Sequence, residues 1–189
     1  IEGDIASAPP RGAVFPEKPG MVGSMLCRRA ALAVTLTLAV TLGVGHASRA
    51  VAGPFRAGAA AVDVTPRGLS AEHPAIIAGG FLEGRADTVH DALLVKAIVL
   101  DDGGGPGGGE PVRVALVVVD SCMMPRALLD EAKRLAAERT GIAPERMMIS
   151  ATHTHSAPAA MGCLGTRVDA PYAAMLPGRI AEAIAAAND

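Results

Sequence analysis

Two apolar runs separated by a helical segment constrain the fold of this chain more than any other feature. Val112–Val119 is apolar almost throughout and rich in β-branched residues, and Met147–Ala151 begins with a second short apolar run. Between them, Pro125–Arg139 places leucine and alanine at helical spacing, and Gly141 is typical of a helix end. The pattern predicts a β-α-β unit with parallel strands and a right-handed crossover. The continuous apolar character of the first strand predicts burial on both faces of the sheet.

Three further segments complete the predicted fold. Arg56–Val64 and Ala92–Leu100 have the composition of strands, and the glycine-rich residues 101–109 predict a long hairpin tip after the second strand. A last helix is expected over Pro171–Ala187, with Asp169 as its candidate N-cap. Its apolar residues recur every four positions: Tyr172, Leu176, Ile180 and Ile184. We therefore expect an α/β fold, in which a mixed sheet contains the parallel β-α-β unit and carries flanking helices.

The first 52 residues have the composition of an export signal rather than of a folded domain. Residues 1–20 are rich in proline and glycine without periodicity, and we expect them to be a non-structural upstream segment. A basic pair, an apolar run (30–44) and a small-x-small motif (50–52) then follow in the order of a signal peptide. The apolar run is shorter than the roughly 20 residues that cross a bilayer. We expect a signal peptide over 21–52, cleavage near Ala52, and a secreted or periplasmic protein.

The composition of the chain argues against a nucleic-acid partner. The formal net charge is −2 and aromatic residues make up 2% of the 189 residues, so the chain has neither a basic surface nor a stacking platform. A chain of 189 residues is long enough for one domain with a substantial core. The three cysteines, Cys27, Cys122 and Cys163, show no Cys-x-x-Cys spacing, which argues against a zinc ribbon or a disulfide framework.

The polar segment after the fourth predicted strand carries the candidate site. In an extended chain the side chains of His153 and His155 share a face, and two imidazoles on one face can ligate a cation such as Zn²⁺. Ligands of open α/β sheets bind beyond the carboxyl ends of the strands. Asp120 ends the neighbouring strand and is expected either to orient the imidazoles or to act as an anion at a helix N-terminus. His73 and His90 lack this setting and are expected to be loop residues.

The His-x-His motif leaves several functions open. The metallo-β-lactamase pattern His-x-His-x-Asp-His fails, because Ala157 and Pro158 occupy its last two positions. An amidohydrolase barrel carries His-x-His after its first strand, whereas at least two predicted strands precede the motif here. An amidohydrolase-type metal enzyme remains an alternative, as does a secreted, non-catalytic α/β module whose histidines are ordinary loop residues.

Five motifs occur in order along residues 55 to 160. They are Ala-Val-Asp-Val-Thr-Pro66, Ala-Gly-Gly-Phe81, the strand from Val-His-Asp to Leu100, Val-Ala-Leu-Val-Val-Val-Asp120 and Ser-Ala-Thr-His-Thr-His-Ser-Ala-Pro158. Together they resemble the N-terminal catalytic domain of the neutral/alkaline non-lysosomal ceramidase family. The resemblance implies that residues 53–189 are the N-terminal, incomplete portion of a larger layered α/β hydrolase domain.

The resemblance also implies an activity. Members of the family are secreted or periplasmic zinc amidases that cleave the N-acyl bond of ceramide to a sphingoid base and a fatty acid. By this resemblance His153 is a zinc ligand, and His155 is the catalytic residue that stabilises or protonates the tetrahedral intermediate. Gly80 lies in a turn against the substrate head group. A ceramide-like lipid substrate further implies peripheral contact with a membrane.

The zinc site that the resemblance implies is incomplete in this chain. The family's remaining ligands, a histidine, a glutamate and a tyrosine, lie farther along the polypeptide. Two imidazoles fall short of the three protein ligands of a catalytic zinc site. Tyr172 lies on the apolar stripe of a helix and is expected in the core. We therefore expect the chain to be an amino-terminal fragment, or a truncated homologue, of a hydrolase.

Overall fold

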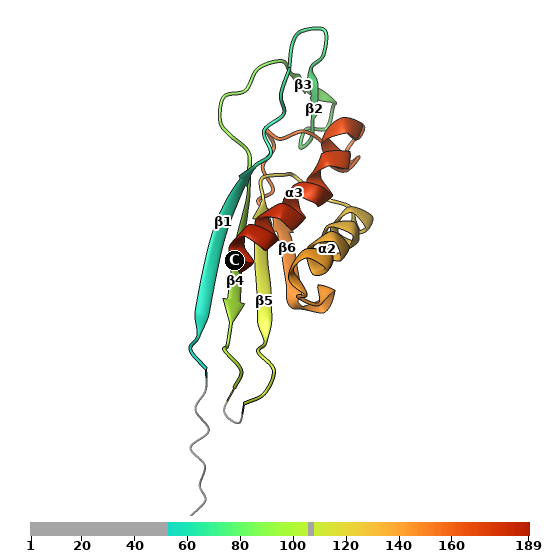
Figure 1. Cartoon of the computed structure of the whole chain (residues 1–189). Helices are drawn as coiled ribbons and strands as arrows, with labels where there is room; N and C mark the ends of the chain where they lie inside the picture. Colours follow the sequence, from blue (N-terminus) through green and yellow to red (C-terminus); the bar gives the residue numbers. More distant parts are fainter. Residues whose placement is uncertain (1–52, 106–107) are drawn as a thin grey trace, which may run out of the picture. The chain divides into compact units, whose positions relative to one another are not determined.

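The computed structural model describes residues 53–105 and 108–189, so the predicted upstream segment and signal peptide lie outside the described residues. The elements appear in the order β1 (Arg56–Asp63), β2 (Ala75–Ile77), β3 (Gly84–Ala86), β4 (Leu94–Asp101), β5 (Arg113–Val119), α2 (Arg126–Thr140), the 3-10 helix η1 (Pro144–Arg146), β6 (Met147–Ala151) and α3 (Ala170–Asn188) (Figure 1). Within these residues no helix has the length and apolarity needed to span a bilayer.

The main sheet is mixed, as predicted. Its strand order is β1-β4-β5-β6, with β1 and β5 antiparallel to β4 and with β6 parallel to β5. Helix α2 connects the parallel pair, which confirms the β-α-β unit. The hairpin between β4 and β5 is also confirmed, and the carboxylates of Asp101 and Asp102 accept hydrogen bonds from the amides of Gly103 and Gly104 at its base.

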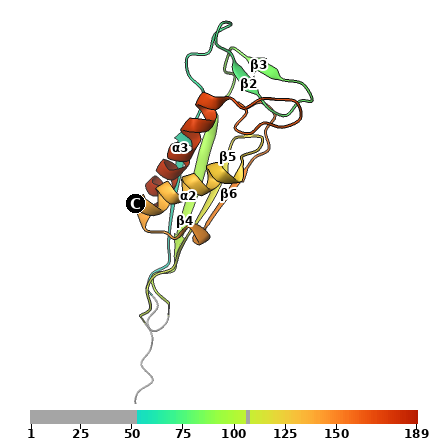
Figure 2. The same ribbon diagram turned by 90° about the vertical axis from the view of Figure 1, so that its right-hand side faces the viewer.

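Both helices cover the same face of this sheet, and the core lies between the helices and the sheet (Figures 1 and 2). Alternate residues of β4 and β5 point into it and are at most 4% exposed: Val95, Ala97, Val99, Ala115, Val117 and Val119. The predicted stripe of α3 is buried as well, and Tyr172 is 4% exposed, which confirms it as a core residue. The end of α3 lies against β1, because a methyl group on Gly58 would be 2.1 Å from the carbonyl oxygen of Ala187.

The opposite face of the sheet is open, so the predicted burial of β5 on both faces is wrong. Ala59, Ile98, Leu116 and Met148 lie in register across the four strands on this face. The three large residues of this row are exposed: Ile98 to 47%, Leu116 to 40% and Met148 to 60%. Because α2 and α3 both pack on the other side, no described element covers this row. An apolar strand sequence is compatible with either arrangement.

Two ends of helices match their predicted caps. Asp169 precedes α3, and its carboxylate accepts hydrogen bonds from the amides of Tyr172 and Ile76. The second of these bonds joins the start of α3 to β2. Gly141 follows α2 with φ of 71°, and its amide donates to the carbonyl of Ala137. This left-handed conformation is one that glycine adopts at no steric cost.

Candidate functional site

The segment with the two histidines is anchored on both sides. Before it, the amide of Thr152 donates to the carbonyl of Val119 at 2.9 Å, which extends the parallel pairing by one residue. After it, Pro158 forms a bridge with Ile77, and the amide of Ala159 donates to the Ile76 carbonyl at 2.7 Å. The β2–β3 hairpin thus holds the far end of the segment. The histidines lie at the carboxyl end of β6, where the sequence predicted them.

His153 is oriented by the backbone of the neighbouring strand. Its Nδ1 lies 2.9 Å from the carbonyl oxygen of Cys122, just beyond β5. A carbonyl oxygen only accepts hydrogen bonds, so Nδ1 carries the proton and Nε2 keeps a free lone pair. Metal-binding histidines commonly hold their second ring nitrogen in this way. The backbone of His153 has φ of 61°, a left-handed conformation that is uncommon outside glycine.

His155 is positioned by Gly79. The two imidazole rings meet edge to face, with centroids 5.0 Å apart and an interplanar angle of 76°. A methyl group added to Gly79 would lie 2.4 Å from Cγ of His155, so the ring packs directly on the glycine backbone. Gly79 also has φ of 115°. Both histidines are exposed, and their rings remain accessible from solvent.

A third ligand-type side chain, which the sequence analysis missed, completes the cluster. Cys122 Sγ lies 3.9 Å from Nδ1 of His153. Together Cys122, His153 and His155 offer one ligand atom each, all within 4.8 Å of one another. The thiol is 3% exposed, and burial raises its pKa, with a smaller contribution from Cys163. A signal existed: Cys122 follows Asp120 by two residues, at the end of the strand that was expected beside the histidines.

The cluster fits the zinc that the family resemblance implies. A sulfur and two imidazole nitrogens are ligand types that zinc prefers, and hard cations such as Mg²⁺ and Ca²⁺ prefer oxygen. The open side of both imidazoles leaves room for a further ligand. The described residues therefore include three candidate protein ligands, one more than the two histidines recognised in the sequence.

Asp120 lies near this cluster but binds elsewhere. Its carboxylate accepts a hydrogen bond from the amide of Leu94 at 2.9 Å, and its own amide donates to the Leu94 carbonyl. In the described part of the chain no hydrogen bond joins it to an imidazole. The carbonyl of Cys122 supplies the orienting contact that was predicted for Asp120.

Gly80 and the other predicted loop residues surround the site or lie apart from it. Gly80 is exposed in the turn that begins at Gly79, and its contact with a substrate stays a prediction. His73 lies in a turn, and its backbone amide donates a hydrogen bond to Oγ of Ser70. His90 is exposed beside Asp91, with 2.9 Å between Nδ1 and the carboxylate, and Asp91 raises the pKa of His90.

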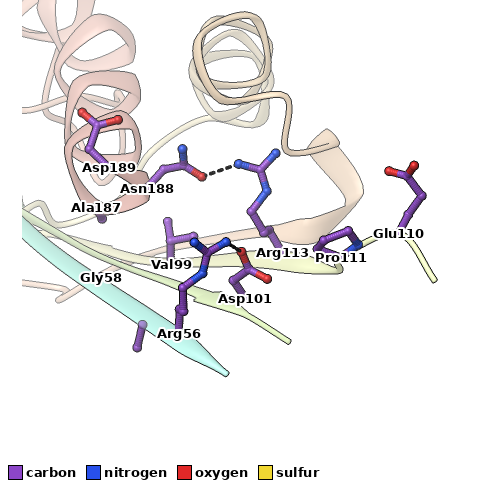
Figure 3. Close-up of a pocket in the computed structure, with 11 residues that line it drawn as sticks. Arg56, Gly58, Val99, Asp101, Glu110, Pro111, Arg113, Ala187, Asn188 and Asp189 are labelled. Atoms are coloured by element: carbon purple, nitrogen blue, oxygen red, sulfur yellow. Dashed lines mark hydrogen bonds and ion pairs between the residues drawn. The ribbon is translucent and has the colours of Figure 1, made fainter. Parts of the chain in front are cut away.

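Two cavities differ in their relation to the histidines. A cavity of about 210 Å³ is lined by Ser156 and Pro158 from the histidine segment and by apolar side chains that include Leu69, Ile77 and Leu93. A second cavity, of about 590 Å³, lies at the other end of the sheet (Figure 3).

A salt bridge and a hydrogen bond border the distant cavity. Arg56 pairs with Asp101 at 2.7 Å, and Arg113 donates to Oδ1 of Asn188 at 2.7 Å. The first contact joins β1 to β4 and the second joins β5 to the end of α3, and neither histidine nor cysteine lines the cavity. We assign it a structural role.

The fold resembles a known hydrolase structure. The sequence matches none of the protein families with which it was compared, and no curated protein is significantly similar to it. The crystal structure of neutral ceramidase from Pseudomonas aeruginosa superimposes with a TM-score of 0.56 and 24% sequence identity. The match covers 71% of this chain and 21% of the ceramidase chain. The likeness shows a ceramidase-like fold, and this chain spans about a fifth of the length of that protein.

Proposed function

We propose that this chain is the N-terminal part of a zinc-dependent amide hydrolase that cleaves the N-acyl bond of ceramide-like lipids. The observation that carries the proposal is the cluster of His153 and His155 at the carboxyl edge of a sheet with a ceramidase-like fold. The mixed sheet disfavours the amidohydrolase barrel, whose strands are all parallel. The exposed pair of imidazoles, one packed on a glycine and the other oriented by a backbone carbonyl, favours a functional site over a non-catalytic module.

The two histidines take different roles in this mechanism. His153, with Nδ1 held by the Cys122 carbonyl, presents Nε2 as the zinc ligand. Zinc, when bound, supplies Lewis-acid polarisation of an amide carbonyl and activation of water. The ring of His155 is exposed beside it and can stabilise the charge that develops on the substrate or deliver a proton to the leaving amine. Gly79 holds the His155 ring in place for this step.

Apolar surface near the site supports a lipid substrate. Phe81 and Leu82 follow the Gly79-Gly80 turn, and each is 84% exposed. Leu164, 53% exposed, belongs to a second turn that meets this one, because a methyl group on Gly165 would lie 3.1 Å from the Phe81 carbonyl oxygen. The cavity beside Ser156 adds an apolar recess. Such surface favours contact with the acyl chain of a lipid or with a membrane surface.

Hydrolysis and metal content test the proposal together. The full-length protein is expected to hold about one zinc per chain and to release fatty acid from an N-acyl sphingoid base. His153→Ala should lose both properties. His73→Ala is the matched control, because His73 is an exposed loop histidine outside the cluster, and it should keep both. Zinc-free full-length protein without hydrolytic activity would reject the proposal.

Export is part of the same proposal. The segment expected as a signal peptide, residues 21–52, would direct the protein to the periplasm or the exterior, where lipid substrates are accessible. N-terminal sequencing of the protein recovered outside the cytoplasm should give a start near Gly53. Retention in the cytoplasm with residues 21–52 intact would contradict this location.

A further inference from the structure

Two turns beside the histidine segment carry large apolar side chains that are exposed. The first turn joins β2 to β3, and its Phe81 and Leu82 are each 84% exposed. The second turn is closed by a bridge between Cys163 and Thr166, and its Leu164 is 53% exposed. Scattered apolar residues are normal on a protein surface, whereas a cluster on adjoining turns indicates a surface that contacts something else.

The backbone of the second turn presents Leu164 outward at a cost in free energy. Its φ of 48° lies in the left-handed region, which is a strained conformation for a bulky residue. The amide of Cys163 donates to the carbonyl of Thr166 at 3.2 Å, and the amide of Thr166 donates to the carbonyl of Cys163 at 2.9 Å. More than half of the Leu164 side chain remains exposed, so burial within the described chain offsets little of this cost. Strained residues of this kind are concentrated at binding and active sites.

A group of three charged side chains joins the two turns. The carboxylate of Glu83 accepts hydrogen bonds from Arg167 at 2.7 and 2.8 Å and from Arg85 at 2.9 Å. The bonds from Arg167, with a smaller contribution from Arg85, lower the pKa of Glu83 to about 2, so the carboxylate is ionised at neutral pH. Two arginines and one carboxylate leave one positive charge in excess. The side chains of Arg85 and Arg167 are 56% and 69% exposed, so their other N–H groups can donate to an acceptor outside the chain.

An apolar cluster bordered by basic side chains matches the chemistry of an anionic bilayer surface. The apolar side chains can reach the boundary of the acyl chains, and guanidinium groups donate hydrogen bonds to the phosphates around them. Each arginine close to an anionic leaflet also gains electrostatic attraction. An uncharged protein surface would leave the excess positive charge without a partner. The location suits a lipid substrate, because Gly79 begins the first turn and packs on the His155 ring.

We propose that these two turns dock the protein on an anionic lipid bilayer, with Phe81, Leu82 and Leu164 in the apolar part of the interface and Arg85 and Arg167 on lipid phosphates. The inference rests on the proposed function for the choice of a lipid surface. It adds to that function the surface through which the protein reaches its substrate. A lipid that leaves the bilayer at the first turn is then already beside the histidines.

Binding to lipid vesicles tests the docking surface without any hydrolysis. The full-length protein is sedimented with vesicles of phosphatidylcholine and phosphatidylglycerol in equal parts, or of phosphatidylcholine alone, with no substrate in either. Leu82→Ser should weaken binding to the mixed vesicles by about tenfold or more, because it removes one apolar anchor. Phe55→Ser is the matched control, since Phe55 is 67% exposed but precedes β1, outside the two turns, and this variant should bind as the wild type does.

Arg167→Gln tests the charged contact separately. It should weaken binding to the mixed vesicles by about fivefold or more, the loss expected for one basic residue near an anionic surface, and should affect binding to phosphatidylcholine alone far less. Arg126→Gln removes the same charge from an exposed ion pair on α2 and should have little effect on either. Equal losses in the two arginine variants would overturn the contact of Arg167 with lipid phosphates.

Hydrogen exchange gives a measurement that needs no variant. The amides of residues 79–84 and 162–168 should exchange more slowly when the mixed vesicles are present, and those of α2 should not change. Protection of the open face of the sheet instead, or no vesicle binding by a protein that hydrolyses a dispersed N-acyl sphingoid base, would overturn the docking surface and leave the proposed function intact. Binding through the two turns without hydrolysis would reject the proposed function and keep the docking surface. An oligomer that Leu82→Ser dissolves, with vesicle binding unchanged, would assign the two turns to contact with a second copy of the chain and overturn the proposal.

Discussion

The contact between Gly79 and His155 shows how one residue without a side chain can position another. Gly79 serves two needs at once, since its φ of 115° disfavours other residues and its missing methyl group makes room for the imidazole. In the predicted Gly79-Gly80 turn, it is therefore the first glycine that positions the His155 ring. The structure gives the second glycine, Gly80, an exposed position in the same turn.

Gly79→Ala should displace His155. The positive φ alone costs about 1–3 kcal/mol of unfolding free energy for a residue with a Cβ. The added methyl group would also lie 2.4 Å from the ring, so the imidazole must move. We expect a fall in the rate of N-acyl hydrolysis together with the lower stability, measured by substrate turnover and urea unfolding.

Gly68→Ala separates the two effects. Gly68 also has a positive φ, of 72°, but a methyl group there would meet no atom within 4 Å. The Gly68→Ala variant should therefore be less stable through backbone strain but hydrolyse the N-acyl substrate at the wild-type rate. Equal turnover in both variants would show that the Gly79 contact does not position His155 for catalysis.

At the scale of elements, the start of α3 supports the histidine segment. Asp169 caps the helix and also binds the amide of Ile76, and the carbonyl of Ile76 binds Ala159 beyond the histidines. A single carboxylate thereby joins α3, β2 and the end of the histidine segment. Its loss should affect both stability and the site.

Asp169→Ala should destabilise the fold by about 2 kcal/mol or more. Loss of an N-cap costs about 1 kcal/mol, and an unpaired, partly buried amide adds a comparable amount. Urea unfolding measures this change. Asp130→Ala is the control, because it removes an exposed i,i+4 pair with Arg126 and should change stability by no more than about 0.5 kcal/mol. Equal losses would contradict the bridging role of Asp169.

The base of the β4–β5 hairpin should give the fold an acid-sensitive element. The amide of Gly103, and after it Arg56, hold the pKa of Asp101 below its ordinary value. The folded chain then binds fewer protons at this carboxyl than the unfolded chain does. The stability that Asp101 contributes is therefore present above the ordinary carboxyl pKa of about 4 and is lost as the pH falls through the lower folded value.

Asp101→Asn should remove this contribution. Urea unfolding between pH 7 and pH 3 should show a smaller loss of stability on acidification in the variant than in the wild type. The variant is expected to be the less stable of the two at neutral pH. An identical dependence on pH in both proteins would assign the acid sensitivity to other groups.

The elements were predictable where local chemistry decides them. Apolar runs indicated the four strands of the main sheet, and Gly141 and Asp169 marked the ends of helices. The strands β2 and β3 were missed, because three residues each are too few for an alternation to be recognised. The pairing of β5 with β6 was predicted, but Asp120 rather than Cys122 was taken as the residue at the end of β5 that orients the histidines.

At the scale of the whole molecule, the open face of the sheet is an exposed apolar surface. The row of Ala59, Ile98, Leu116 and Met148 is apolar and lies opposite the helices. The sequence predicted burial here, since composition indicates what a strand can tolerate and not which element covers it. Exposed apolar surface of this kind favours association.

Leu116→Lys should reduce association of the segment from residue 53 to residue 189. Leu116 is 40% exposed in the centre of the open face, so a charged side chain there can reach water. We expect the unmodified segment to bind a hydrophobic dye and to self-associate in analytical ultracentrifugation, and the variant to do both less. Val117→Lys, on the buried face of the same strand, should instead unfold the segment. Equal association of Leu116→Lys and the unmodified segment would exclude this face as the contact.

The parallel pairing of β5 with β6 also sets the order in which the molecule can mature. Cys122 and His153 are separated by 31 positions and meet only after α2 has folded back and the strands have paired. Pairing of this kind forms slowly, because the entropy of closing the loop is lost before the contacts form. A nascent or misfolded chain therefore lacks the contact that orients the His153 imidazole. The proposed zinc ligand takes up this orientation only when the crossover is complete.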